Sequence, residues 1–139
     1  MSFSELISPL IGRGLLAWFF LSSAIGIMGD FEGQAQVMTI KHLPVPQLLL
    51  VATLMVLILG GLSLLIGFHT RAGALLLFAF TLIASMVMLD FWHVADPIGR
   101  NDEYDLFARN VAIAGGLLLL VGMGPGAFAV DNSLAPKKR

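Results

Sequence analysis

Residues 46–89 decide the fold, and they read PQLLLVATLMVLILGGLSLLIGFHTRAGALLLFAFTLIASMVML. Two runs within this stretch, 46–67 and 72–89, contain no Asp, Glu, Lys or Arg. A helix needs about 20 mostly apolar residues to cross the hydrocarbon core of a bilayer, and both runs come close to that length. Because only the short segment 68–71 separates them, the two helices must lie side by side and antiparallel. The stretch therefore predicts a transmembrane helical hairpin.

The composition of the whole chain agrees with this prediction. Hydrophobic residues make up 58% of the 139 residues and charged residues 12%, against averages of about 45–50% and about 25% in soluble domains. The net charge of −1 provides no basic surface for a nucleic acid. The chain has no cysteine, which excludes disulfides, thiolate catalysis and metal sites built on thiolates. The sequence thus indicates a small integral membrane protein whose first partner is the lipid bilayer.

Two further apolar stretches flank the hairpin and complete an all-α, four-helix membrane bundle in a single domain, residues 1–139. We expect helices near 7–28, 46–67, 71–91 and 104–123. The connections 29–45 and 92–103 contain prolines and charges, so we expect them to be loops. We also expect the first helix to be retained rather than cleaved as a signal peptide, because Glu5 precedes it and no small-residue cleavage site follows.

Positively charged residues predict the orientation of the bundle in the membrane. Cytoplasmic segments of membrane proteins carry an excess of Lys and Arg. One side of the predicted bundle holds Arg13, Arg71, Lys137, Lys138 and Arg139. The other side, which has nearly all of the acidic residues, holds Lys41, Arg100 and Arg109. We therefore expect both termini to face the cytoplasm and the two long loops to face outward.

Small residues are the expected contacts between the helices. Lipid removes the hydrophobic force between membrane helices, so close backbone approach at Gly and Ala takes its place. The candidates are Gly60, Gly61 and Gly67 in the second helix and Ala108, Ala112 and Gly116, at four-residue spacing, in the fourth. We expect these residues to hold a compact bundle together.

Arg109 is the first candidate for a binding residue, because a charge inside a membrane helix is expensive and usually has a partner. If the fourth helix begins near Tyr104, Arg109 lies about 7.5 Å into the span. Asp90, at the outer end of the third helix, is the expected partner. We favour an ion pair that locks the two helices together. The alternative is an anchor for a quinone, a lipid headgroup or an acidic substrate, with Asn110 and Trp92 as further candidate contacts.

Arg13 and two histidines are weaker candidates. Arg13 lies near the inner end of the first helix, where a long side chain usually extends to the membrane surface; binding of an anionic lipid or of a partner is the alternative. His42 and His93 are both expected on the outer side and could together ligate a metal or a haem iron. No third ligand at a fixed spacing supports such a site, so we expect interfacial histidines and no haem. We identify no catalytic residue and no phosphate-binding loop.

Several short motifs along almost the whole chain resemble those of the DoxX family of small four-helix membrane proteins. The motifs are Gly12-Arg13, Phe31-x-Gly33, Pro44-x-Pro46, Gly60-Gly61, Gly67-Phe68-x-Thr70-Arg71, Phe107-x-Arg109-Asn110 and Gly115-Gly116. The resemblance implies a location in the bacterial inner membrane. It also implies a link to quinones, since the name-giving members resemble subunits of quinol oxidases and of thiosulfate:quinone oxidoreductases.

The chain departs from this family pattern at positions where many relatives carry ionisable residues. Ile27 stands in place of a Lys, Leu57 in place of a Glu and Asp90 in place of a His. Membrane-embedded Lys and Glu are the groups that proton transfer would use. We therefore expect an accessory or stabilising subunit of a larger membrane complex, linked to quinone electron transfer, rather than an enzyme. The alternatives are a quinone-binding oxidoreductase component and a small-molecule transporter that acts as a homo-oligomer.

Overall fold

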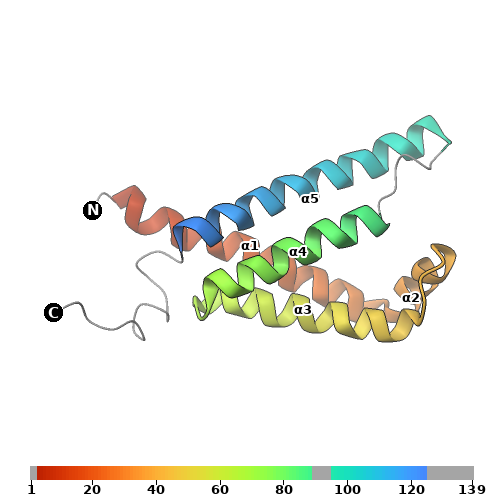
Figure 1. Ribbon diagram of the computed structural model, residues 1–139, viewed down its shortest axis with the longest axis horizontal. Coiled ribbons are helices and arrows are strands. Elements are labelled where there is room, and N and C mark those ends of the chain that lie inside the picture. The colour runs from red at the N-terminus through yellow and green to blue at the C-terminus, as the bar shows by residue number, and fades with distance from the viewer. Residues whose placement is uncertain (1–2, 89–94, 125–139) are drawn as a thin grey trace.

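The computed structural model describes residues 3–88 and 95–124, and within them the chain is entirely helical (Figure 1). The helices are α1 (Phe3–Gly29), α2 (Phe31–Ile40), α3 (Pro46–Ile66), α4 (Thr70–Met88) and α5 (Pro97–Met123). Four of them, α1, α3, α4 and α5, are long and apolar enough to cross a membrane. The all-α class and the four spans are therefore confirmed. The count of four helices is wrong, because α2 is a fifth.

Helix α2 lies within the segment 29–45, which we expected to be a loop. Ala35 and Met38 of α2 are buried together with Leu50 of α3. The helix ends at Ile40, and the amide of the following residue, Lys41, still donates to the Val37 carbonyl. The segment is helical because this short apolar face packs on the start of α3. Its mixed polar sequence alone does not predict that contact.

Helix α5 begins at Pro97, seven residues before the start predicted near residue 104. The side chain of Asp96 caps it by accepting hydrogen bonds from the amides of Ile98 and Gly99. Proline suits the first position of a helix, because its fixed φ is helical and no amide is needed there. The predicted loop 92–103 is therefore helical from residue 97 onward. For the third predicted helix, the described part ends at Met88, and residues 89–91 lie outside the described residues.

The expected hairpin is formed by α3 and α4, which a tight turn connects. Gly67 ends α3 in the left-handed conformation, with φ of 75°, which glycine adopts at little cost. Its amide donates to the Ser63 carbonyl, and the Ser63 hydroxyl donates to the Phe68 carbonyl. His69, also left-handed with φ of 47°, belongs to the same turn. The turn thus satisfies carbonyl groups that the end of α3 would otherwise leave open.

The long helices pack in the order α1, α3, α4, α5. Two glycines on α3 make this possible: Gly60 lies against Leu77 of α4, and Gly61 against Leu21 of α1. The core between the helices consists of buried apolar side chains: Ala17, Phe20, Ala24, Leu57, Leu64, Ala74, Leu77, Leu117 and Leu120.

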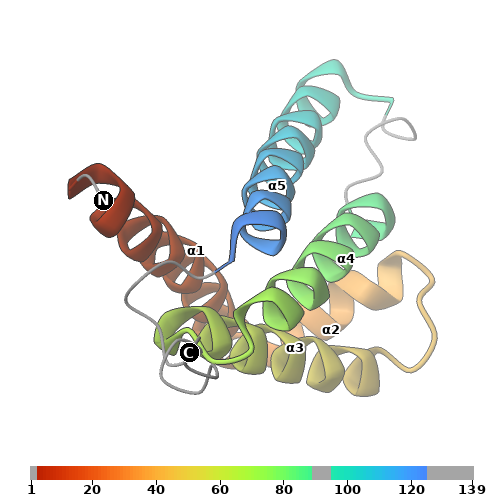
Figure 2. The same cartoon turned by 60° about the vertical axis from the view of Figure 1, so that its left-hand side comes forward.

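The bundle is not closed, because α1 and α5 make few contacts with each other. Figure 2 shows the two helices standing apart at the end where α1 begins and α5 ends. We call this the terminal end; it also holds the α3–α4 turn, and α2 lies at the opposite end (Figure 1). The expected compact bundle is therefore wrong on this side. Helix α5 packs mainly on α4, which leaves its side toward α1 open.

Candidate functional site

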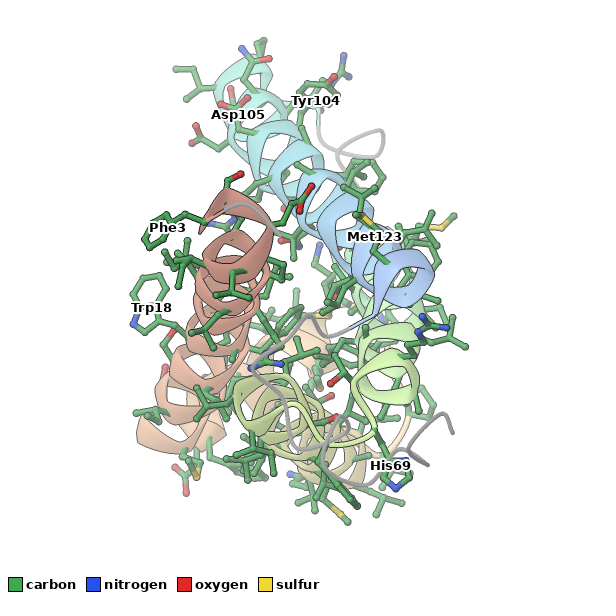
Figure 3. The ribbon with its side chains drawn as sticks, turned by 90° about the vertical axis from the view of Figure 1, so that its left-hand side faces the viewer. Phe3, Trp18, His69, Tyr104, Asp105 and Met123 are labelled. Carbon is green, nitrogen blue, oxygen red and sulfur yellow. The ribbon has the colours of Figure 1, made fainter. Side chains whose placement is uncertain are left out.

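A groove of about 850 Å³ lies between α1 and α5 at the terminal end. Its walls are mostly apolar and include Leu16 from α1 and Leu119 and Met123 from α5. Gly12 and Gly116 also line it and add no side chain to its volume. Figure 3 looks at the molecule from this end, with Met123 on α5 and the N-terminal part of α1 on separate sides. Ligand sites in proteins commonly have volumes of about 300–1,000 Å³, so the groove is large enough for a small amphiphile.

Arg13 lies in the lining of this groove and is only 3% exposed. We expected its side chain to extend to the membrane surface, and the structure instead buries it. Arg71 is not part of the lining; its Nη2 is 3.0 Å from the point where a Cβ on Gly124 would stand, and Gly124 lines the groove. Glu5 is the acidic residue of the lining. The lining of the groove thus holds one cationic side chain and one carboxylate.

A second polar cluster connects α5 with both of its neighbours, farther from the terminal end. Asn110 Nδ2 donates to Ser85 Oγ of α4 at 2.9 Å, and Ser85 is 2% exposed. The adjacent Arg109 places its Cζ 5.6 Å from the ring centroid of Phe19 on α1, a cation–π contact. Asn110 thus ties α5 to α4, and Arg109 connects α5 with α1.

The described residues do not include the partners predicted for Arg109. Asp90, Trp92 and His93 lie outside them, so the ion pair and the outer quinone contacts stay predictions. Because α5 begins at Pro97, Arg109 lies about 18 Å along its axis at 1.5 Å per residue, rather than about 7.5 Å from the helix start. Its side chain is exposed.

Neither His42 nor any other described residue belongs to a metal cluster. His42 is exposed and left-handed, with φ of 60°, just after α2. In residues 3–88 and 95–124, no group of three or more His, Asp or Glu side chains is placed to hold a metal ion. His93 lies outside the described residues, so the alternative of a metal site shared by His42 and His93 stays a hypothesis.

The small residues predicted to pack the helices occupy four different settings. Gly60 and Gly61 lie at interhelical contacts and Gly67 lies in the turn. Gly116 faces the groove, with Leu16 Cδ2 3.9 Å from where its Cβ would stand. The remaining two, Ala108 and Ala112, are exposed. The role of this α5 stripe in helix packing therefore stays a prediction.

Leu57 and Ile27, two of the positions at which the family resemblance implies ionisable residues, lie at the core. Leu57 is 4% exposed, and Ile27 packs against the same buried cluster. Apolar side chains here complete the packing between α1 and α3. The sequence did not indicate the groove itself, because Leu119 and Met123 are indistinguishable from lipid-facing residues in sequence. The sequence feature that points to the groove is the pair Gly12-Arg13, in which a charged residue follows a residue without a side chain.

Four apolar spanning helices, of which α3 and α4 form the tight central hairpin, define a multi-pass integral membrane protein. The family model named DoxX matches residues 8–90. The inner membrane protein YqjF of Escherichia coli is 32% identical over 133 residues, 96% of each chain. The inner membrane protein YphA of the same organism is 31% identical, covering 88% of this chain and 87% of that protein. This chain belongs to the DoxX family and is a multi-pass protein of the bacterial inner membrane.

A further relative matches a shorter part of this chain. The Surfeit locus protein 4 homolog of Schizosaccharomyces pombe is 38% identical over 69 residues, which cover 48% of this chain and 22% of that protein. No solved structure matches this chain.

The hydrogen bond between Asn110 and Ser85 should stabilise the α4–α5 contact. We expect Asn110→Ala and Ser85→Ala each to lower the free energy of unfolding by about 1 kcal/mol, as interhelical hydrogen bonds in membrane proteins do. The double variant should lose less than the sum of the two, because either single change already removes the bond. Unfolding in detergent, followed by circular dichroism, measures this. Strictly additive losses would show that the hydrogen bond contributes nothing.

Proposed function

We propose that this chain is an accessory or stabilising subunit of a larger membrane complex and that the complex carries out quinone-linked electron transfer. The observation that supports the first part is the poor coverage of α5. Only three residues of α5, Ala114, Leu117 and Leu120, are buried within the chain, against five in α3 and six in α4, although both of those helices are shorter. A helix that its own chain covers so little has a large face available for a partner.

The face of α5 that carries Ala108 and Ala112 is suited to a partner helix. Both alanines are exposed, and they stand four residues apart, on the same side of the helix. Small residues at this spacing let two membrane helices approach closely. The stripe continues along α5 to Gly116, where the groove begins. The partner would thus contact the middle of α5.

The quinone-linked part of the proposal draws on the family. The name-giving members of the DoxX family resemble subunits of quinone-dependent oxidoreductases, and this chain carries the same motifs. Leu57 and Ile27, buried or packed at the core, leave no ionisable group at two positions where many relatives have one. These apolar residues favour a stabilising role for this chain in the complex over proton transfer within the chain.

The decisive experiment is the native mass of the protein after mild solubilisation from its own membranes, with the co-migrating chains identified. We expect a mass far above that of one 14.9 kDa chain, with partner subunits in fixed stoichiometry. Ala112→Leu should release the partners by blocking close approach of the helix. Ala52→Leu, at an exposed position of α3, is the matched control and should leave the complex intact.

Two results would overturn the proposal. A stable monomer without partners would exclude the subunit role. A small homo-oligomer without partners would do the same and would direct work to transport assays in proteoliposomes.

A further inference from the structure

We infer that the first turns of α1, residues 3–8, form a lid that swings on a hinge at Pro9 toward α5 and closes the groove between the two helices. This inference does not depend on the proposed subunit role, because it concerns the terminal end of α1 and not the exposed face of α5. Three observations support it. The lid has no buried residue, a proline separates it from the packed part of α1, and it forms one wall of the groove.

The lid is the part of α1 that the rest of the chain covers least. Burial in α1 begins at Arg13 and continues along the helix at Ala17, Phe20 and Ala24. Phe3, the first residue of the lid, is 78% exposed. Segments with few buried contacts open and close at a low cost in free energy. The lid can therefore change its position while the packed part of α1 stays in place.

Pro9 provides the hinge. Proline has no amide hydrogen, so α1 lacks the backbone hydrogen bond that residue 9 would otherwise donate, and the proline ring crowds the preceding turn. Gly12 and Gly14 lie three and five residues farther on, and glycine weakens a helix interior further. A Cβ on either glycine would meet no atom within 4 Å, so close packing does not account for them. Helix α1 is thus weakest close to the point where its buried part begins.

The length of α1 places the lid beyond the hydrocarbon core of the membrane. Its 27 residues extend over about 40 Å at 1.5 Å per residue, whereas the core of a bilayer is about 30 Å thick. Counted from Gly29 at the other end, the excess of about 10 Å corresponds to about seven residues, which are the lid and Pro9. The lid can therefore move among the lipid headgroups without carrying open backbone groups into hydrocarbon.

The wall opposite the lid allows a close approach. Ser8 lines the groove on the lid, and Met123 and Gly124 line it on α5; small residues let two membrane helices come close, and a methionine side chain adapts to its neighbours. Farther along the groove the walls already approach each other, since Leu16 Cδ2 is 3.9 Å from where a Cβ on Gly116 would stand. At the terminal end the two helices stand apart (Figure 2). Movement of the lid toward α5 would enclose the groove and separate it from the surrounding lipid.

The test is disulfide cross-linking of the full chain in membranes, where the absence of native cysteine lets one introduced pair report one contact. Ser8→Cys with Met123→Cys places one thiol on the lid and one on α5, at exposed positions that line the groove. A disulfide requires Cα atoms within about 7 Å of each other, so it records closure. We expect the pair to cross-link under a mild oxidant. Adding Pro9→Ala restores the missing backbone hydrogen bond and should slow the cross-link about fivefold, the effect of one such bond.

Two control pairs separate the lid from the rest of α1. Ile7→Cys with Met123→Cys uses the neighbour of Ser8 that does not line the groove, so this pair should not cross-link. Gly12→Cys with Leu119→Cys lies in the groove on the far side of the hinge from the lid. Its cross-linking rate should be the same with and without Pro9→Ala.

Hydrogen exchange provides a second measurement that needs no introduced cysteine. The amides of residues 10–13 donate to carbonyls on the other side of Pro9 in a regular helix. In detergent they should exchange about fivefold faster in the unmodified protein than in Pro9→Ala, because bending at the hinge exposes them.

The lid is excluded if the Ser8–Met123 pair, in a protein with preserved helicity, does not cross-link. A cross-linking rate that Pro9→Ala leaves unchanged would exclude the hinge, as would equal exchange at residues 10–13 in the two proteins. Equal cross-linking of the Ile7 pair would show that the movement is not directed into the groove.

Discussion

Replacing Gly60 with valine will strongly reduce the amount of folded protein in the membrane. A Cβ at Gly60 would stand 2.6 Å from Cγ and 2.7 Å from Cδ2 of Leu77, well inside contact distance. Leu77 is 0% exposed, so it has no free space to move into. We expect α3 and α4 to be forced apart, at a cost of about 3 kcal/mol, the upper end of the range for overpacked cores. Membrane accumulation and thermal stability in detergent measure the effect.

The control for this prediction is Gly115→Val. Gly115 is also a helical glycine, but a Cβ there would meet nothing within 4 Å. Valine at this position changes the intrinsic helix preference without creating a clash, so stability should stay close to that of the unmodified protein. If both variants accumulate equally well, the close approach of α3 and α4 at Gly60 is not what holds the hairpin together.

Truncating Phe20 to alanine should have the next largest effect. Phe20 is 2% exposed in the core, and its ring packs edge-to-face on that of Phe19, with the centroids 5.1 Å apart. In soluble proteins Phe→Ala in a core costs about 3–5 kcal/mol. Here we expect about 2 kcal/mol, because the separated helices remain in lipid and only the packing part is lost. Unfolding in a denaturing detergent gives this free energy.

Trp18→Ala provides the comparison, since it also removes an aromatic side chain from α1. Trp18 is 68% exposed and points away from the other helices in Figure 3. Its loss should change the unfolding free energy by much less than the loss of Phe20. Equal losses would indicate that contacts with detergent or lipid, rather than packing against α3, determine the contribution of these aromatic residues.

The hairpin could be predicted from sequence because two long uncharged runs joined by a short segment leave few other folds than two antiparallel membrane helices. The start of α5 was also within reach, since Asp96 followed by Pro97 is a known helix-start signal. The charges that follow Pro97 favour a loop at first sight, but charged residues are equally compatible with a helix that extends beyond the membrane. Helix α2 was not predictable in the same way. Its stability depends on Leu50, which belongs to another helix.

The candidate site was harder to predict than the helices, for a physical reason. Whether Arg13 reaches the membrane surface or is buried depends on where α1 and α5 separate, and apolar periodicity does not determine that. Likewise, Ala108 and Gly60 are both small residues on membrane helices. One is exposed and the other lies at a helix contact, because α3 is packed between α1 and α4, whereas α5 packs mainly on α4 alone.

The packing order α1, α3, α4, α5 matches the order in which the long helices are made. Long helices that follow one another in the chain are packing neighbours, and α1 and α5, which lie farthest apart in the sequence, make few contacts, a pattern that speeds folding. Because α5 does not have to close onto α1, assembly during translation can proceed in one direction. The chain can thus reach its fold as it enters the membrane, because the packing of α1 does not have to wait until α5 has been made.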